Sequence, residues 1–108
     1  MLFLFGCKED SVEGNTREFH NPHNDPVNIT IEEANQIALE QAEIDGIDNP
    51  ILSEWLETKI QSKYSIKYDR DMKIYSVYIR SGNRAEDYTV DGSYYISTET
   101  GEFIESTH

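Results

Sequence analysis

Cysteine and basic residues are scarce in this chain, and each scarcity excludes a class of protein. A single cysteine occurs among 108 residues, so no disulfide can form within the chain. Lysine and arginine number 9 against 21 aspartates and glutamates, which gives a formal net charge of -12. Such a polyanion repels phosphate backbones, and we therefore expect no nucleic-acid partner.

Long apolar runs and well-placed histidines are also missing. No stretch approaches the roughly 18 apolar residues from which a membrane-spanning helix is built. The three histidines, His20, His23 and His108, lie in segments that the sequence predicts to be tails. A nucleophile and its base need a rigid scaffold to stay within about 3 Å of one another. We therefore assign no catalytic residues and expect that the chain is not an enzyme.

A metal site is the next alternative, and it has few candidate ligands. His20, His23 and Asp25 are close enough in sequence to share an ion. A structural zinc site usually takes four protein ligands, however, and these three stand in a segment with no predicted fold. We therefore expect neither a metal nor a cofactor.

The one cysteine follows a short apolar run at the N-terminus. Residues 4–7, Leu-Phe-Gly-Cys, resemble a bacterial lipobox, in which an apolar residue stands three before the cysteine and a small residue directly before it. The resemblance implies a diacylglycerol thioether on Cys7 and cleavage after Gly6. The run is shorter than the ~7–15 residues of a signal core and has no preceding Lys or Arg. We therefore interpret residues 1–7 as the remnant of a lipoprotein signal and expect the reading frame to begin upstream. The alternative is an incidental apolar patch with a free cysteine.

Two further parts follow this remnant. Residues 8–28 contain Pro, Asn, Gly and Ser at intervals that interrupt every periodic pattern. Such a segment cannot bury enough apolar surface to offset its ordering entropy, so we predict a flexible tether. Residues 29–106 carry periodic apolar patterns and are predicted to form one domain.

The domain opens with signals for one helix and then for a second. Thr30 followed by Glu33 forms a capping box, and apolar residues at helical spacing continue to about Ile44. An Asn-Pro pair then precedes a second apolar stripe, which predicts a helix over residues 50–62. Trp55, the only tryptophan, is expected to be a core anchor of that helix.

The remainder of the chain favours strands. All seven tyrosines lie beyond residue 63, and aromatic and β-branched residues suit pleated, half-buried surfaces. Strands are predicted at 64–68, 73–80, 87–91, 93–98 and 102–105. Asp91-Gly92 suits a tight hairpin, and Thr100-Gly101 suits a second turn. Helices followed by strands predict an α+β domain, with one or two N-terminal helices packed on an antiparallel meander sheet.

Three segments resemble the PepSY-domain family. Residues 29–38 are similar to its opening helix, which is capped by Ser or Thr and followed by two acidic residues and Ala. Residues 75–79 resemble its central strand, and residues 95–104 resemble its closing strand pair with a Thr-Gly turn. The resemblance covers roughly residues 29–105, although the segments at 50–62 and 81–92 exceed the simplest family pattern. It implies a domain without catalytic residues, of a kind thought to restrain peptidases or sense ligands near the cell envelope.

Binding is the class of function that remains, and the tyrosines suggest where it would occur. If Tyr75 faces the helices, strand alternation places Tyr78 on the opposite face of the sheet. Tyrosine offers apolar area and a hydroxyl at low entropic cost, which suits interfaces. The candidate binding face comprises Tyr78, Ile74, Tyr94 and Tyr95. The alternative is a solvent-tolerant outer face with no partner.

These observations together lead to one expectation of function. The chain would be a non-catalytic binding module, held by lipid on Cys7 at the extracytoplasmic side of the cell membrane. Its partner would be a peptidase, which it would restrain, or another envelope protein. The alternative is a structural envelope lipoprotein or a small-ligand sensor without a peptidase partner.

Overall fold

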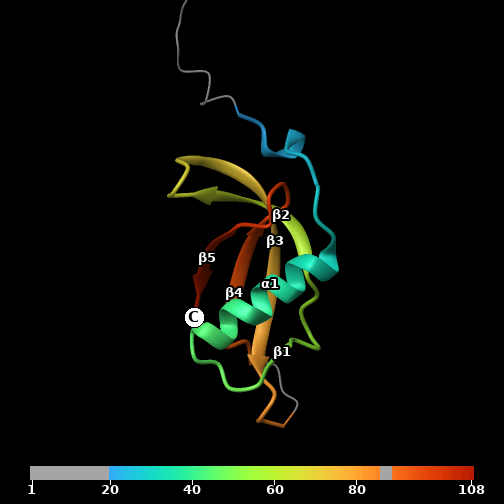
Figure 1. The fold of residues 1–108 in the computed structure, drawn as a ribbon. Coiled ribbons are helices and arrows are strands. Elements are labelled where there is room, and N and C mark those ends of the chain that lie inside the picture. The colour runs from blue at the N-terminus through green and yellow to red at the C-terminus, as the bar shows by residue number, and fades with distance from the viewer. Residues whose placement is uncertain (1–19, 86–88) are drawn as a thin grey trace, which may run out of the picture.

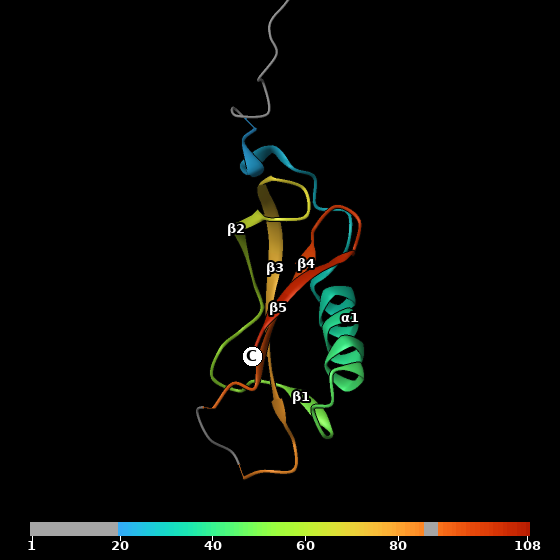
Figure 2. The same cartoon turned by 90° about the vertical axis from the view of Figure 1, so that its left-hand side faces the viewer.

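The computed structural model describes residues 20–85 and 89–108, which form one α-helix and a five-stranded antiparallel sheet. The helix packs on one face of the sheet (Figures 1 and 2), so the predicted α+β class is confirmed. In chain order the elements are η2 (Pro22–Asn24), α1 (Ile31–Ile44), β1 (Pro50–Leu52), β2 (Lys59–Ser65), β3 (Arg70–Ser81), β4 (Gly92–Ser97) and β5 (Phe103–Thr107).

Strand β3 is the centre of the sheet. Strands β2, β3, β4 and β5 form an antiparallel meander, as predicted. The edge of β3 that faces β2 is shared between two strands, because β2 pairs with residues 70–76 and β1 pairs with residues 79–81. Between these two strands the chain leaves the sheet as a loop over residues 53–58.

The capping box predicted at the start of α1 is confirmed. Thr30 Oγ1 accepts a hydrogen bond from the Glu33 amide at 3.1 Å, and Glu33 Oε1 accepts one from the Thr30 amide at 2.8 Å. Two amides that have no partner within the helix are thereby satisfied. The helix ends at Ile44, which is also where the sequence placed its end.

Replacing Thr30 with alanine should lower the free energy of unfolding by about 1 kcal/mol, because the Glu33 amide loses its acceptor. A denaturant titration measures the change directly. Thr107→Ala is the matched control, since it removes the same side chain from the exposed end of β5. An equal midpoint for Thr30→Ala and the unmodified protein would show that the cap contributes nothing.

The core lies between α1 and the helix-facing side of β3 and β4. Its members are fully or almost fully buried, and they are Ala34, Ala38, Ala42, Tyr75, Val77, Ile79, Tyr94 and Ile96. The three alanines stand four residues apart and therefore form one row along the helix. Their small side chains let α1 approach the sheet closely. Tyr75, Val77 and Ile79 share the helix-facing side of β3, as the alternation of side chains along a strand requires.

The prediction of a second helix, over residues 50–62, is wrong. Residues 50–62 contain β1, the 53–58 loop and the start of β2. The apolar stripe satisfied a helical period, but the long strand β3 requires partners along its edge, and these residues supply them. Trp55 is 48% exposed in the loop and is not a core anchor.

The turns of the sheet were predicted with mixed success. Gly101 has a φ angle of +79°, the left-handed conformation expected of the Thr-Gly turn. The prediction of a tight hairpin at Asp91-Gly92 is wrong, because a long connection separates the end of β3 at Ser81 from the start of β4 at Gly92. The strand predicted at 87–91 lies partly outside the described residues, and residues 89–91 are not in a strand. The first predicted strand, at 64–68, is displaced, since β2 covers Lys59–Ser65.

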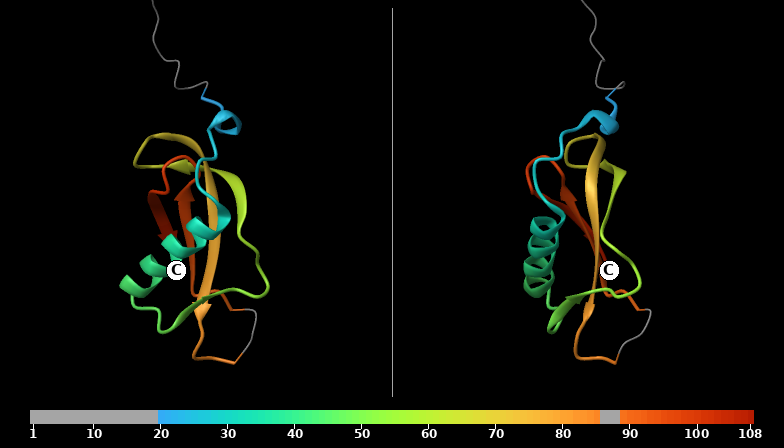
Figure 3. Two further views of the ribbon diagram at one scale, coloured as in Figure 1. Left: turned by 45° about the vertical axis from the view of Figure 1, so that its right-hand side comes forward. Right: turned by 90° about the vertical axis from the view of Figure 1, so that its right-hand side faces the viewer.

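Residues 20–28 are bound to the sheet, so the tether prediction is wrong for this part of the chain. The segment passes the end of β3 before it enters α1 (Figure 3). The Lys73 amide donates a hydrogen bond to Asp25 Oδ2 at 3.1 Å, and Thr98 Oγ1 donates one to the Pro26 carbonyl at 2.9 Å. The folded unit therefore includes residues 20–28. The rest of the predicted tether, 8–19, and the lipid-attachment candidate Cys7 lie outside the described residues.

Candidate functional site

The four residues of the predicted binding face do not form one exposed surface. Tyr94 is 0% exposed and belongs to the core beneath α1. Ile74 lies on the opposite face of the sheet from α1, yet it is only 1% exposed. Tyr78 and Tyr95 share that outer face and are partly exposed. The prediction is therefore wrong for Tyr94, because neighbouring residues of a strand point to opposite faces, and for Ile74, because its side chain is covered.

Long polar side chains cover Ile74. Lys63 Nζ lies 4.6 Å from the centre of the Tyr95 ring and 3.3 Å from Glu105 Oε2. Lys63 is opposite Met72 on β3, and Tyr95 is opposite Ser76, so Ile74 lies between them. The lysine stem thus covers apolar surface while its ammonium group remains near water. The outer face consequently presents little apolar area to a partner.

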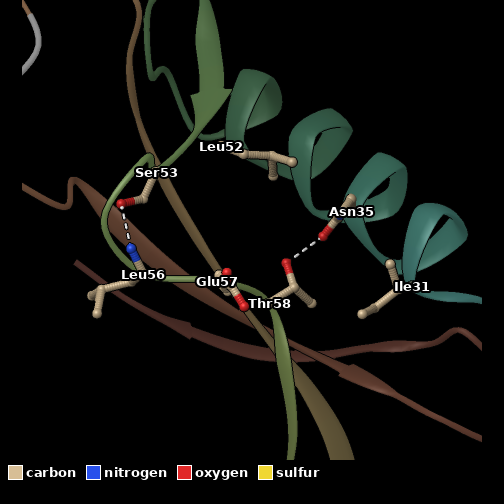
Figure 4. A pocket seen from close by; sticks show the side chains of 7 residues that line it. All are labelled: Ile31, Asn35, Leu52, Ser53, Leu56, Glu57 and Thr58. Carbon is tan, nitrogen blue, oxygen red and sulfur yellow. Dashed lines mark hydrogen bonds between the residues drawn. The ribbon is translucent and has the colours of Figure 1, made fainter.

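Exposed apolar side chains gather instead beside the helix. A groove of about 270 Å³ separates α1 from the loop that joins β1 to β2 (Figure 4). We name it the α1–loop groove, and its lining residues are Ile31, Asn35, Leu52, Ser53, Leu56, Glu57 and Thr58. Ile31 is 40% exposed and Leu52 is 36% exposed, and both point toward the space between helix and loop. Leu56, on the far side of the loop, points away from α1.

Hydrogen bonds within the loop give the groove its shape. Ser53 Oγ accepts hydrogen bonds from the amides of Trp55 and Leu56, both at 3.1 Å. A serine hydroxyl commonly supports a turn in this way. At the other end of the loop, the Thr58 hydroxyl donates to Asn35 Oδ1 of α1 (Figure 4). The two walls of the groove are therefore connected directly.

An ion pair holds the outside of the loop against β3. Arg80 Nε donates to Glu54 Oε1 at 2.8 Å, and Arg80 Nη2 donates to Glu54 Oε2 at 2.6 Å. The Arg80 side chain is 4% exposed, and its Nη1 also donates to the carbonyls of Ser81 and Arg84. The hydrogen bonds from Arg80 hold the pKa of the Glu54 carboxyl below its usual value. Such a two-pronged contact fixes both distance and orientation.

The groove lies in the strongly acidic half of the domain. Between His20 and Thr58 the sequence has nine aspartates and glutamates and neither lysine nor arginine. Five carboxylates of α1 and the loop are exposed and form no ion pair within the described part of the chain; they are Glu32, Glu33, Glu40, Glu43 and Glu57. The groove is therefore an apolar surface bordered by uncompensated negative charge.

Another cluster of polar groups, at the end of α1, has a structural role. Tyr94 donates a hydrogen bond to Asp45 Oδ2 at 3.1 Å, and His108 Nε2 lies 3.0 Å from the same hydroxyl. Burial, assisted by the hydrogen bond to Asp45, raises the pKa of Tyr94. This cluster connects the end of α1 to β4 and to the last residue of the chain.

The histidines near the start of the domain do not assemble a metal centre with their neighbours. His20 Nε2 lies 2.9 Å from Asp25 Oδ1. Across residues 20–85 and 89–108, no group of three or more His, Cys, Asp or Glu side chains could hold a metal ion.

Sequence reasoning missed the groove because it assigned the loop to a helix. Leu52 and Leu56 stand four apart, which is the spacing of a buried helical stripe. The burial of β2 alternates on a two-residue period, but its less exposed positions are the polar residues Gln61, Lys63 and Ser65. The sequence of residues 59–65 therefore gave no clear strand signal, and nothing in it marked the preceding residues as a connection.

Comparison of the chain with protein-family models, with curated proteins and with solved structures found no match. None of the helices in the described ranges combines the length and the apolar character that crossing a membrane requires.

Proposed function

We propose that this protein is a non-catalytic, lipid-anchored binding module on the extracytoplasmic side of the cell membrane, which docks a segment of a partner polypeptide in the α1–loop groove. The groove itself carries the proposal, because it combines exposed aliphatic side chains with walls that are fixed in place. Contiguous exposed apolar surface bordered by polar residues is typical of interaction sites.

The polar groups in the groove support binding in preference to catalysis. Asn35 accepts a hydrogen bond from Thr58, and Ser53 Oγ accepts from two loop amides. These side chains are thus used to shape the loop. The remaining lining residues are mainly aliphatic, which suits the recognition of an apolar side chain.

The resemblances in the sequence supply the cellular context of the proposal. The lipobox-like run before Cys7 supports anchoring by lipid, and the PepSY-like segments support a peptidase or another envelope protein as partner. The alternative of a small-ligand sensor has less support, since small-molecule sites commonly enclose roughly 300–1,000 Å³. The α1–loop groove has about 270 Å³ and is open.

Metabolic labelling tests the anchor. The gene is expressed from its natural start in a bacterium that is fed labelled fatty acid. We expect label in the product and its recovery with membranes, and we expect Cys7→Ser to abolish both. Unlabelled protein that is recovered away from membranes would contradict lipid anchoring.

Affinity capture from solubilised envelopes tests the docking function. The unmodified protein and Ile66→Ser should retain the same partner, whereas Leu52→Ser should lose it. Ile66 is a suitable control because it is 80% exposed and lies outside the groove. Addition of the protein should inhibit a retained peptidase in proportion to dose. A partner that binds all three variants equally would show that the groove is not the docking site.

A further inference from the structure

We infer that the partner segment is cationic and amphipathic: it places aliphatic side chains in the α1–loop groove and directs lysine or arginine side chains to the carboxylates beside it. This inference rests on the proposed function and deepens it by naming the chemistry of the partner. The apolar lining and the charge of its border are independent observations that lead to the same class of ligand.

The apolar part of the surface extends beyond the groove. Leu52 of β1 and Ile31 of α1 lie toward opposite ends of the groove, with Asn35 and Thr58 between them (Figure 4). Ile60 on β2 is 46% exposed and is paired with Tyr75, so it lies on the same side of the sheet as α1. An apolar strip thus continues from the groove onto β2. One aliphatic side chain of a partner would fill the groove, and a second would contact Ile60.

The charged border follows from the geometry of the helix. Residues four apart lie on the same face, so Ile31, Asn35, Leu39 and Glu43 form one row along α1. The adjacent row contains Glu32, Gln36 and Glu40, and it is exposed. Glu57 supplies a carboxylate on the loop side of the groove. An aliphatic side chain in the groove would therefore have anionic groups on both sides.

Residues 20–58, which contain all the residues that line the groove, have neither lysine nor arginine. Every lysine and arginine of the described residues lies at or after Lys59. Of these, Lys63, Lys67, Arg80 and Arg84 are paired with carboxylates. Apart from Glu54, which is paired with Arg80, the carboxylates of residues 20–58 have no lysine or arginine partner among the described residues. Their negative potential attracts a cationic partner and accelerates its association.

The same charge disfavours a membrane surface as the occupant. Anionic lipid headgroups, such as those of bacterial membranes, would face the carboxylates of α1. Like charges repel, so this contact is unfavourable. Membrane-surface segments usually present lysine and arginine beside their apolar residues, which is the opposite of what is observed here. A polypeptide that bears these basic residues fits the groove and its border.

Titration of the full chain with two synthetic peptides tests the inference. One peptide alternates leucine and lysine in an amphipathic pattern, and the other has glutamate in place of every lysine. Trp55 reports binding through its emission because it is the only tryptophan and lies in the groove loop. We expect the lysine peptide to bind at least about tenfold more tightly at low salt, and 0.5 M salt to remove most of that difference.

Variants separate the two contributions. Leu52→Ser and Ile31→Ser should each weaken lysine-peptide binding by about tenfold, while Ile66→Ser should leave it unchanged. The double variant Glu32→Gln, Glu57→Gln should reduce the preference for the lysine peptide without changing the stability of the fold. Equal affinity for both peptides would overturn the inference. Lysine-peptide affinity that is the same in Leu52→Ser, Ile31→Ser and the unmodified protein would also overturn it. Binding to lipid vesicles with no peptide binding would also overturn it.

Failure of this inference can be distinguished from failure of the proposed function. If Cys7→Ser leaves the membrane association unchanged while the peptide results are as expected, the anchor is wrong and the docking chemistry stands. If labelling and partner capture succeed but the captured partner binds equally well to Glu32→Gln, Glu57→Gln, the function stands and the charge-based inference is wrong.

Discussion

Replacing Ala38 with leucine should destabilise the protein by roughly 2–3 kcal/mol and move α1 away from the sheet. Ala38 is 0% exposed and is the middle residue of the alanine row that faces the β3 and β4 core. Because protein interiors are close-packed, three additional carbons have no space without displacement of the helix. A denaturant titration measures the loss, and the emission of Trp55 reports a change in the adjacent loop.

Glu40→Leu is the matched control for this substitution. It places the same side chain on the exposed side of the same helix, where the expected change is within about 0.5 kcal/mol. The helix forms one wall of the α1–loop groove, so Ala38→Leu should also weaken peptide binding. Similar stabilities for the two variants would show that the contact between α1 and the sheet is loose enough to accept a leucine.

The first helix could be predicted from the sequence because its signals are local. The Thr30–Glu33 capping box and the alanine row lie within one segment, and the geometry of a single helix connects them. The helix-facing side of β3 was predictable for a similar reason, since alternation within one strand assigns its faces. Long-range contacts were not needed for either prediction.

The second helix failed because long-range pairing decided the structure of residues 50–62. Their apolar residues satisfy a helical period, but β3 spans Arg70–Ser81 and is paired along the edge that β1 and β2 share. Pro50 pairs with Ser81, which lies 31 positions further along the chain. The residue pattern within 50–62 cannot indicate a pairing over that distance. Tertiary context therefore overrode local propensity.

The candidate site was missed for related reasons. Alternation placed Ile74 on the outer face correctly, yet only the fold shows that Lys63 reaches Tyr95 and Glu105 above it. The α1–loop groove joins residues from two separate segments, α1 and residues 52–58, and the second of these had been assigned to a helix. The acidic composition was visible from the start, but its concentration around the groove became meaningful only when the groove was located.

Replacing Glu54 with glutamine should loosen the 53–58 loop and increase hydrogen exchange at the Trp55 and Leu56 amides by about tenfold. Glu54 accepts two hydrogen bonds from the buried guanidinium of Arg80, and glutamine can neither accept both nor neutralise the charge. Arg80 keeps the carbonyls of Ser81 and Arg84 as acceptors, so the fold should survive. Peptide binding should weaken in parallel, because one wall of the groove becomes mobile.

The pH dependence of this effect has a definite sign. Arg80 holds the pKa of Glu54 below its usual value of 4.5, so the folded state favours the ionised carboxylate. The contribution of the pair is therefore fully present above about pH 4.5 and is lost as the pH falls through the lowered pKa of the folded state. The exchange rates of the unmodified protein should approach those of Glu54→Gln in acid, after correction for intrinsic exchange. Glu57→Gln, three residues further along the same loop, lacks an ion pair among the described residues and should match the unmodified protein. Equal exchange in Glu54→Gln and Glu57→Gln at neutral pH would show that Arg80 does not hold the loop.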